Sequence, residues 1–146
     1  MKKAIVYYSK TGNTKIVAER FSGFDLLRIK AESDNPNILK PVLVETPEVK
    51  DYDYLIFASP VHAFSLCRVM VAYLKSLEDL SGKAIDLYVT HQFPFAWLGG
   101  NQSLKQMKKI IEAKNGEVRF MTSVNWGSKK REEVIEAMIK QYVNKK

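Results

Sequence analysis

Apolar runs and helix-like patterns alternate along the chain. Five runs rich in β-branched and aromatic residues predict strands, and four stretches with apolar residues at helical spacing predict helices. The third run is almost continuously apolar, which is typical of a central strand covered on both faces. The second alternates less cleanly and indicates an edge strand. The predicted strands are residues 3–8, 25–29, 54–58, 84–90 and 117–124, and the predicted helices are residues 13–21, 67–77, 101–113 and 129–142, with Asn115-Gly116 as a C-cap.

This alternation predicts a doubly wound α/β fold. A parallel sheet with right-handed crossovers places helices on both faces, and it binds ligands at the carboxyl ends of its strands. One segment departs from the pattern, because residues 30–52 contain Pro36, Pro41 and Pro47 and only weak periodicity. We expect the crossover helix there to be short or irregular, and we expect one domain over residues 1–146.

A hydroxyl-rich turn separates the first strand from the first helix. Its Gly and Asn tolerate left-handed backbone angles, which lets successive N–H groups converge on one point beside a helix start. Such a turn can hold a phosphate, although ordinary turn and N-cap chemistry uses the same residue types. It is neither a nucleotide-triphosphatase P-loop nor a Gly-x-Gly-x-x-Gly turn. The candidate residues are Ser9, Lys10, Thr11, Gly12, Asn13 and Thr14.

The same segment resembles the phosphate loop of flavodoxins. That loop has two apolar residues, an aromatic, a free position, Ser or Thr, then a small residue, Thr, Ala and an aliphatic at fixed spacing. Only Phe21 departs, as one apolar residue in place of another. The resemblance implies FMN as cofactor, a five-stranded sheet in the order 2-1-3-4-5, and the short-chain type, because the fifth strand is uninterrupted. The matching residues are Ile5, Val6, Tyr7, Ser9, Gly12, Thr14 and Ala18.

The segment after the third strand is similar to the second flavodoxin loop, which contacts the flavin ring. That loop commonly reads Ser/Thr-Pro, an apolar residue, an aromatic and a small residue. Here His62 occupies the aromatic position, where it can stack on the ring or respond to flavin reduction through its near-neutral pKa. The alternative is a solvent-facing histidine without a role. The candidate residues are Ser59, Pro60, Val61, His62, Ala63 and Phe64.

The segment after the fourth strand is rich in aromatic residues and ends in a glycine pair. It occupies the place of the third flavodoxin loop, and its composition suits a planar ligand. The alternatives are a cap on the sheet or a dimer interface. Phe93 and Trp97 are the candidates for stacking on the ring. The predicted contacts are Thr90, His91, Gln92, Phe93, Trp97, Gly99 and Gly100.

The composition indicates where the protein works and which kinds of site it lacks. The single cysteine, Cys67, excludes an internal disulfide and, with only two histidines, argues against a metal site. No apolar run approaches a membrane span, so we expect a cytoplasmic protein without membrane association. The net charge is +7, and residues 101–146 hold 11 Lys and Arg against 5 Asp and Glu. These charges lie on amphipathic helices, which indicates a solvated face rather than a nucleic-acid site.

Other families that share features of this chain lack their defining residues here. A receiver domain needs clustered acids after its first strand and an aspartate ending the third. A low-molecular-weight phosphatase needs Cys and Arg around its phosphate loop, whereas Cys67 and Arg68 are adjacent elsewhere. No Gly-x-Ser-x-Gly elbow is present.

The resemblance therefore implies an electron carrier that serves redox partner proteins, as a monomer or homodimer. Because the chain is basic and flavodoxins are usually acidic, we expect acidic partners and a higher redox potential than is typical. A flavin-dependent NAD(P)H or quinone reductase, and a flavodoxin-fold binding module without flavin, remain as alternatives.

Overall fold

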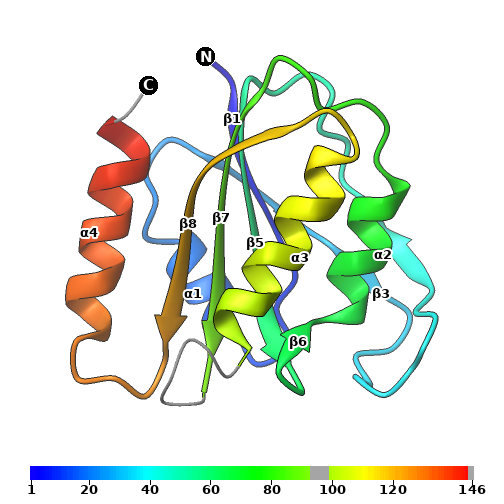
Figure 1. Ribbon diagram of the computed structural model, residues 1–146, viewed down its shortest axis with the longest axis horizontal. Coiled ribbons are helices and arrows are strands. Elements are labelled where there is room, and N and C mark those ends of the chain that lie inside the picture. Colours follow the sequence, from blue (N-terminus) through cyan, green and yellow to red (C-terminus); the bar gives the residue numbers. More distant parts are fainter. Residues whose placement is uncertain (93–98, 145–146) are drawn as a thin grey trace.

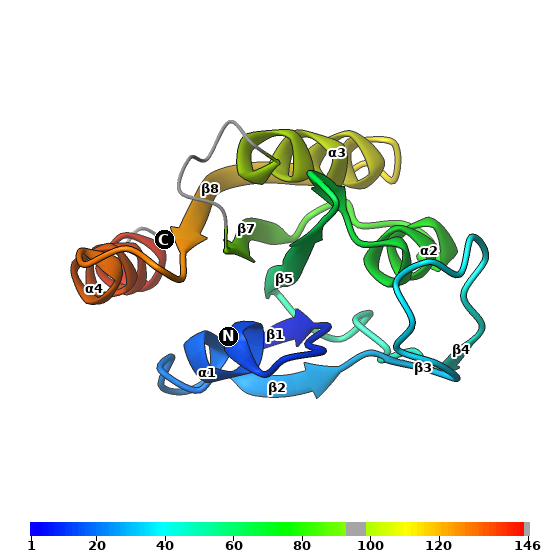
Figure 2. The same ribbon diagram turned by 90° about the horizontal axis from the view of Figure 1, so that it is seen from below.

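A computed structural model describes residues 1–92 and 99–144 (Figure 1). Its centre is a parallel sheet in the order β2-β1-β5-β7-β8, which confirms the predicted fold class and strand order. Helices cover both faces of this sheet (Figure 2). The sheet strands are β1 (Lys3–Tyr7), β2 (Asp25–Arg28), β5 (Tyr54–His62), β7 (Ala84–His91) and β8 (Glu117–Asn125), and the helices are α1 (Asn13–Ala18), α2 (Arg68–Ser76), α3 (Gly100–Glu112) and α4 (Arg131–Asn144).

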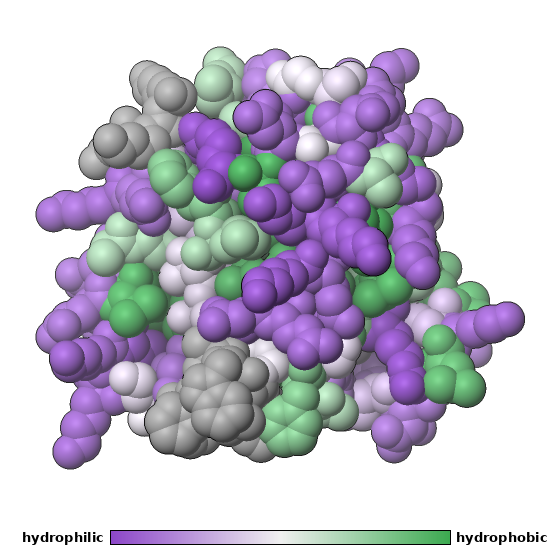
Figure 3. All heavy atoms as spheres, viewed as in Figure 1, coloured by the Kyte–Doolittle hydropathy of each residue, from purple (hydrophilic) through white to green (hydrophobic). Residues whose placement is uncertain are grey.

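Two apolar cores lie on the two faces of the sheet. On one face α2 and α3 bury Met70, Tyr73 and Met107 against the strands, and on the other α1 and α4 bury Val17 and Met138. β1 and β5 contribute side chains to both cores, which explains their nearly continuous apolar sequences. The outer faces of α2 and α3 are hydrophilic (Figure 3). Among the described residues, no helix is long and apolar enough to cross a membrane.

The crossover between β2 and β5 contains no helix, so the expectation of a short or irregular one was wrong. Residues 30–52 form an antiparallel hairpin instead, with strands β3 (Lys30–Ala31) and β4 (Leu43–Glu45). The three prolines explain this, because each removes a backbone donor and disfavours helix around it. Ile29 and Val49 are buried and anchor the two ends of the segment.

The other predicted boundaries differ from the observed ones mainly at two places. α1 ends at Ala18, three residues early, and the chain continues in tighter turns in which the Phe21 amide donates to the Ala18 carbonyl at 3.1 Å. β5 extends to His62 rather than ending at Ala58. β1 ends opposite Ala58, so beyond it β5 has a neighbour on one side only and tolerates Pro60.

The end of α3 follows the prediction closely. Asn115 adopts a left-handed conformation (φ 68°), and the Gly116 amide donates to the Ile111 carbonyl at 3.0 Å. A side chain at Gly116 would lie 2.5 Å from the Ile111 side chain, so this close turn needs glycine. The turn then directs the chain into β8.

Candidate functional site

The candidate phosphate loop follows β1 at the carboxyl edge of the sheet. Gly12 has φ 99°, which glycine adopts without strain. The buried Ser9 hydroxyl accepts hydrogen bonds from the amides of Gly12 at 3.1 Å and Lys15 at 3.4 Å. Within the described residues, the amides of Thr11, Asn13 and Thr14 donate to no backbone or side-chain acceptor. Ser9 thus fixes the loop, and the remaining donors are available to a ligand.

Thr14 connects this loop to the middle of the sheet. Its buried hydroxyl lies 2.9 Å from the Thr90 hydroxyl, and the Tyr88 hydroxyl donates to the Thr14 carbonyl at 2.8 Å. Thr14 and Thr90 come from two of the three predicted segments, so the structure brings these segments together. Lys10 and Thr11 lie exposed on the loop, and Asn13 is half-buried.

The second predicted segment is mostly strand rather than loop, which corrects its expected conformation. Ser59 to His62 continue β5, and only Ala63 and Phe64 form the turn into β6 (Ser65–Leu66). Both turn residues are left-handed, with φ 46° and 65°. Such backbone angles are costly for residues other than glycine and are concentrated at functional sites. The turn exposes Phe64, whose side chain is 48% accessible.

Interactions below the turn hold it in place. The Gln106 side chain of α3 accepts hydrogen bonds from the Leu66 amide at 2.8 Å and the Ser65 hydroxyl at 3.2 Å. The buried Ser59 hydroxyl donates to the Pro60 carbonyl at 3.0 Å and lies 3.1 Å from the Cys67 sulfur. Cys67 is 2% accessible and burial raises the pKa of its thiol, so it is a packing residue rather than a nucleophile.

His62 is half-buried and lies within the influence of two cations. Burial lowers the pKa of its imidazole, and the positive charges of Lys10 and Arg68 lower it further. A cavity of about 10 Å³ separates His62 from the hairpin loop, and Tyr8, Arg68 and Asp34 help to line it. The Tyr8 hydroxyl donates to Asp34 at 2.7 Å, and Arg68 donates to the Asn37 carbonyl at 3.1 Å.

The sequence alone did not predict that Tyr8, Asp34 and Arg68 would lie beside the site. Tyr8 and Arg68 flank predicted segments, which was an available signal. Nothing in the pattern of residues 30–52 indicated that Asp34 would reach the carboxyl edge, because that depends on the hairpin. Arg28 is a further missed residue, and its guanidinium donates to the Ser9 carbonyl at 3.5 Å.

The third predicted segment begins with the buried residues Thr90 and His91 and the exposed Gln92. Phe93 and Trp97 lie outside the described residues. Gly99 has φ 123°, and a side chain there would lie 2.6 Å from the Phe64 Cα. A side chain at Gly100 would lie 2.3 Å from the Ser123 hydroxyl. The glycine pair therefore allows close packing of α3 against the β5–β6 turn and β8.

The three segments meet because β1, β5 and β7 are neighbours in the sheet. Their carboxyl ends lie on one edge, where the candidate phosphate loop, the β5–β6 turn and the start of α3 adjoin (Figure 1). The strand order reverses at β1 and β5, which is the expected ligand position in such a sheet. The arrangement offers backbone donors at one end and imidazole and aromatic groups further along.

Solved structures share this architecture across nearly the whole chain. The sequence matches no family model and no curated protein. The flavodoxin, WrbA-like protein from Agrobacterium tumefaciens is 15% identical with a TM-score of 0.73, covering 98% of this chain and 95% of its own. Flavodoxin 2 from Bacillus cereus is 13% identical with a TM-score of 0.71, covering 99% of both chains. A Streptococcus pneumonia flavodoxin is 16% identical with a TM-score of 0.67, covering 100% of both. The fold of this chain is thus flavodoxin-like.

Proposed function

We propose that this protein binds FMN at the carboxyl edge of its sheet and carries electrons between redox partner proteins. The observation that carries the proposal is the loop from Ser9 to Thr14, where three amides without a described acceptor flank a left-handed glycine. Amides in this arrangement bind phosphate. The solved structures similar to this chain include flavodoxins, which supports flavin as the group that carries this phosphate.

The residues present fit each part of FMN. The loop amides and Lys10 would hold the phosphate, and the segment from Ser59 to Phe64 would line one side of the flavin ring. Thr90, His91, Gln92 and the Gly99-Gly100 pair would border the ring on the β7 side, with Phe93 and Trp97 as stacking candidates. FMN supplies the uptake and release of electrons when it is bound, and the protein sets its position and surroundings.

The protein's own contribution is a rigid frame. Ser9 fixes the loop, the Thr14–Thr90 hydrogen bond joins the loop to β7, and Gln106 fixes the turn that presents His62 and Phe64. These connections pre-order the described part of the site, which favours affinity.

Flavin binding is tested by titrating the purified protein into FMN and into riboflavin and following flavin fluorescence. We expect FMN to be quenched and riboflavin to bind about a hundredfold more weakly, because several charge-assisted hydrogen bonds to phosphate are lost. Flavin released from the purified protein should be FMN by chromatography. A colourless protein that leaves FMN fluorescence unchanged would refute the proposal.

The role as a carrier needs a separate measurement. We expect the FMN-loaded protein to show no sustained NADPH or NADH oxidation with a quinone, and to be reoxidised rapidly by an electron-accepting protein. Sustained turnover without a partner protein would indicate a reductase rather than a carrier. The proposal that the protein binds FMN would still stand.

A further inference from the structure

We propose that an acidic protein docks on the carboxyl edge of the sheet, through a basic rim around Phe64. This inference rests on the proposed function, because the docked protein would exchange electrons with the flavin at this edge. The basic rim is defined as Lys10, Arg68, Lys129 and Lys130.

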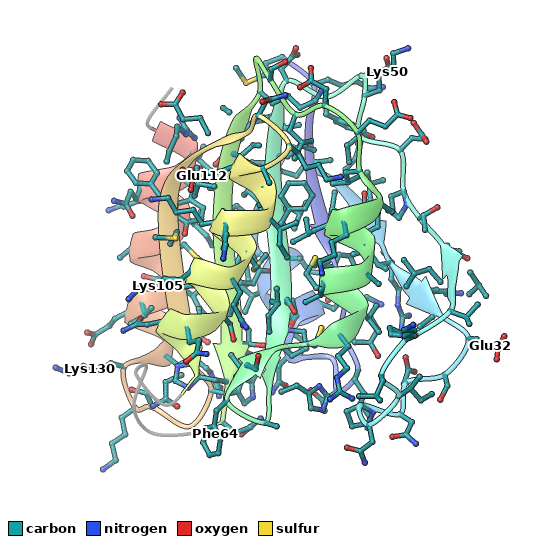
Figure 4. All side chains as sticks on the ribbon, turned by 45° about the vertical axis from the view of Figure 1, so that its right-hand side comes forward. Glu32, Lys50, Phe64, Lys105, Glu112 and Lys130 are labelled. Atoms are coloured by element: carbon teal, nitrogen blue, oxygen red, sulfur yellow. The ribbon has the colours of Figure 1, made fainter. Side chains whose placement is uncertain are left out.

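The basic rim follows from the topology. Lys10 follows β1, Arg68 begins α2 after the β5–β6 turn, and Lys129 and Lys130 follow β8. All of these loops lie at the carboxyl edge, and all four side chains are exposed. Phe64 and Lys130 project at this end of the molecule, whereas Lys50 lies at the other (Figure 4).

Acidic side chains also lie near the basic rim, and one of them, Glu132, is neutralised by an ion pair. Asp34 accepts the Tyr8 hydrogen bond, and Glu132 pairs with Arg20 at 2.7 Å. Glu32 and Glu133 are exposed and reduce the local positive charge, while Arg28 adds to it. The segment between Gln92 and Gly99 contains no charged residue in the sequence. A bound FMN phosphate would offset Lys10, whereas Lys129 and Lys130 follow β8, three strands away from the candidate phosphate loop, and keep that side of the edge positive.

The opposite edge carries charges of both signs, because Lys2 and Lys3 lie there at the amino end of β1. The loops before β5, β7 and β8 are rich in exposed carboxylates, which outnumber the lysines among them. The exposed cations of the basic rim therefore orient an acidic molecule toward the carboxyl edge before contact. The exposed acids of the opposite edge are Glu48, Asp51, Asp53, Glu78, Asp79, Glu112 and Glu117.

Phe64 gives the edge the apolar centre that protein interfaces use. It is 48% accessible and sits on a two-residue turn whose left-handed backbone is held by β6 and α3. Protein interfaces combine a central aromatic residue with a polar rim, and aromatic residues dominate their binding energy. Nucleic-acid sites instead need basic groups spaced along a backbone, so an acidic protein fits this surface better.

The test measures binding of the FMN-loaded protein to two haem proteins of opposite charge, acidic cytochrome b5 and basic cytochrome c. Titration calorimetry gives Kd at about 10 mM and about 200 mM salt, since screening acts over about 10 Å at 0.1 M. The charge variant is Lys129→Glu/Lys130→Glu. Its matched control is Lys50→Glu/Lys75→Glu, which changes the net charge equally at the opposite edge.

We expect cytochrome b5 to bind at least about tenfold more tightly than cytochrome c at low salt, and this preference to fall at high salt. The Lys129/Lys130 variant should lose about tenfold in affinity and the control less than about twofold. Phe64→Ala should weaken binding at both salt concentrations, because apolar contact is not screened.

Equal losses in both charge variants, or tighter binding of cytochrome c, would overturn the proposal. So would a DNA duplex that displaces cytochrome b5 from the basic rim with higher affinity. The binding measurement does not depend on electron transfer, and flavin content is measured separately. A protein without FMN that still binds cytochrome b5 through the rim would refute the proposed function alone, whereas an FMN-loaded protein without this preference would refute the docking surface alone.

Discussion

Ser9 acts on the candidate phosphate loop through an inward-facing oxygen. Its hydroxyl accepts two amide hydrogen bonds, at 3.1 and 3.4 Å, and so fixes where the neighbouring amides point. A phosphate site of this kind depends on that arrangement as much as on the donors themselves.

Ser9→Ala should therefore weaken FMN binding. The loss of two hydrogen bonds that order the loop is worth about 1–2 kcal/mol, or about a tenfold rise in Kd. Fluorescence titration with FMN measures this, and Ser22→Ala, an exposed serine away from the loop, is the control. Unchanged affinity in Ser9→Ala would show that the loop holds its shape without this side chain.

His62 should be neutral at pH 7, because burial, Lys10 and Arg68 all lower the pKa of its imidazole. It takes up a proton only below its usual value of about 6.5. In an NMR titration, Arg68→Gln should raise the His62 pKa and Lys75→Gln should not. An unshifted titration in Arg68→Gln would mean that this charge does not act on the imidazole.

Elements on the α4 face are connected by a buried polar cluster at the start of β7. Asp86 is fully buried and accepts hydrogen bonds from Arg119 of β8 at 2.8 Å, from the Phe120 amide at 3.0 Å and from the Tyr54 hydroxyl. Tyr54 also donates to the Tyr142 carbonyl of α4 at 3.2 Å. The register of β7 and β8 shifts at this point, so the Asp86 carboxylate satisfies an amide that the irregular ladder leaves available.

Asp86→Asn should destabilise the fold by about 3 kcal/mol, because it leaves the partly buried Arg119 guanidinium without its counter-charge. Urea denaturation measures this loss. Glu117→Gln, an exposed change on the neighbouring strand β8, should cost less than about 0.5 kcal/mol. Because Asp86 lies near the amino end of its strand, FMN affinity should not change. A loss below about 1 kcal/mol would contradict the structural role.

The molecule as a whole should lose stability in alkali. Burial raises the pKa of the hydroxyls of Tyr54, Tyr73, Tyr88 and Tyr142. In the unfolded chain they ionise near their ordinary value of about 10, while in the native protein they stay protonated, so unfolding releases protons above that pH. The contribution of these tyrosines to the free energy of unfolding should be constant below about pH 10 and should fall steeply above it. Urea curves at several pH values test this, and Tyr142→Phe should reduce the slope.

The charge distribution also bears on the redox potential of bound FMN. Lys10, Arg28 and Arg68 stand near the candidate site, and positive charge favours the anionic reduced flavin. We expect both couples to lie above those of an acidic flavodoxin measured in the same titration. A second couple as low as that of the acidic protein would contradict this expectation, and the potential of Arg68→Gln should be lower than that of the wild type.

The sequence by itself determined the alternation of strands and helices, the parallel sheet and the position of the candidate phosphate loop. These features follow from local patterns. The apolar runs, Gly12 and Asn115-Gly116 each determine the backbone conformation of residues close to them in the sequence. The conformation of residues 30–52 could be predicted only in part, since prolines disfavour a helix without specifying the hairpin that replaces it.

Only the tertiary structure decided which neighbours surround the site. The cavity that His62 lines together with the hairpin loop, the Thr14–Thr90 hydrogen bond and the Asp86 cluster all join residues far apart in the chain. The basic rim is of the same kind, because Lys10 and Arg68 share an edge with Lys129 and Lys130 only once each loop is assigned to an end of the sheet. Contacts and fields depend on distances in space, which strand order and crossover direction determine.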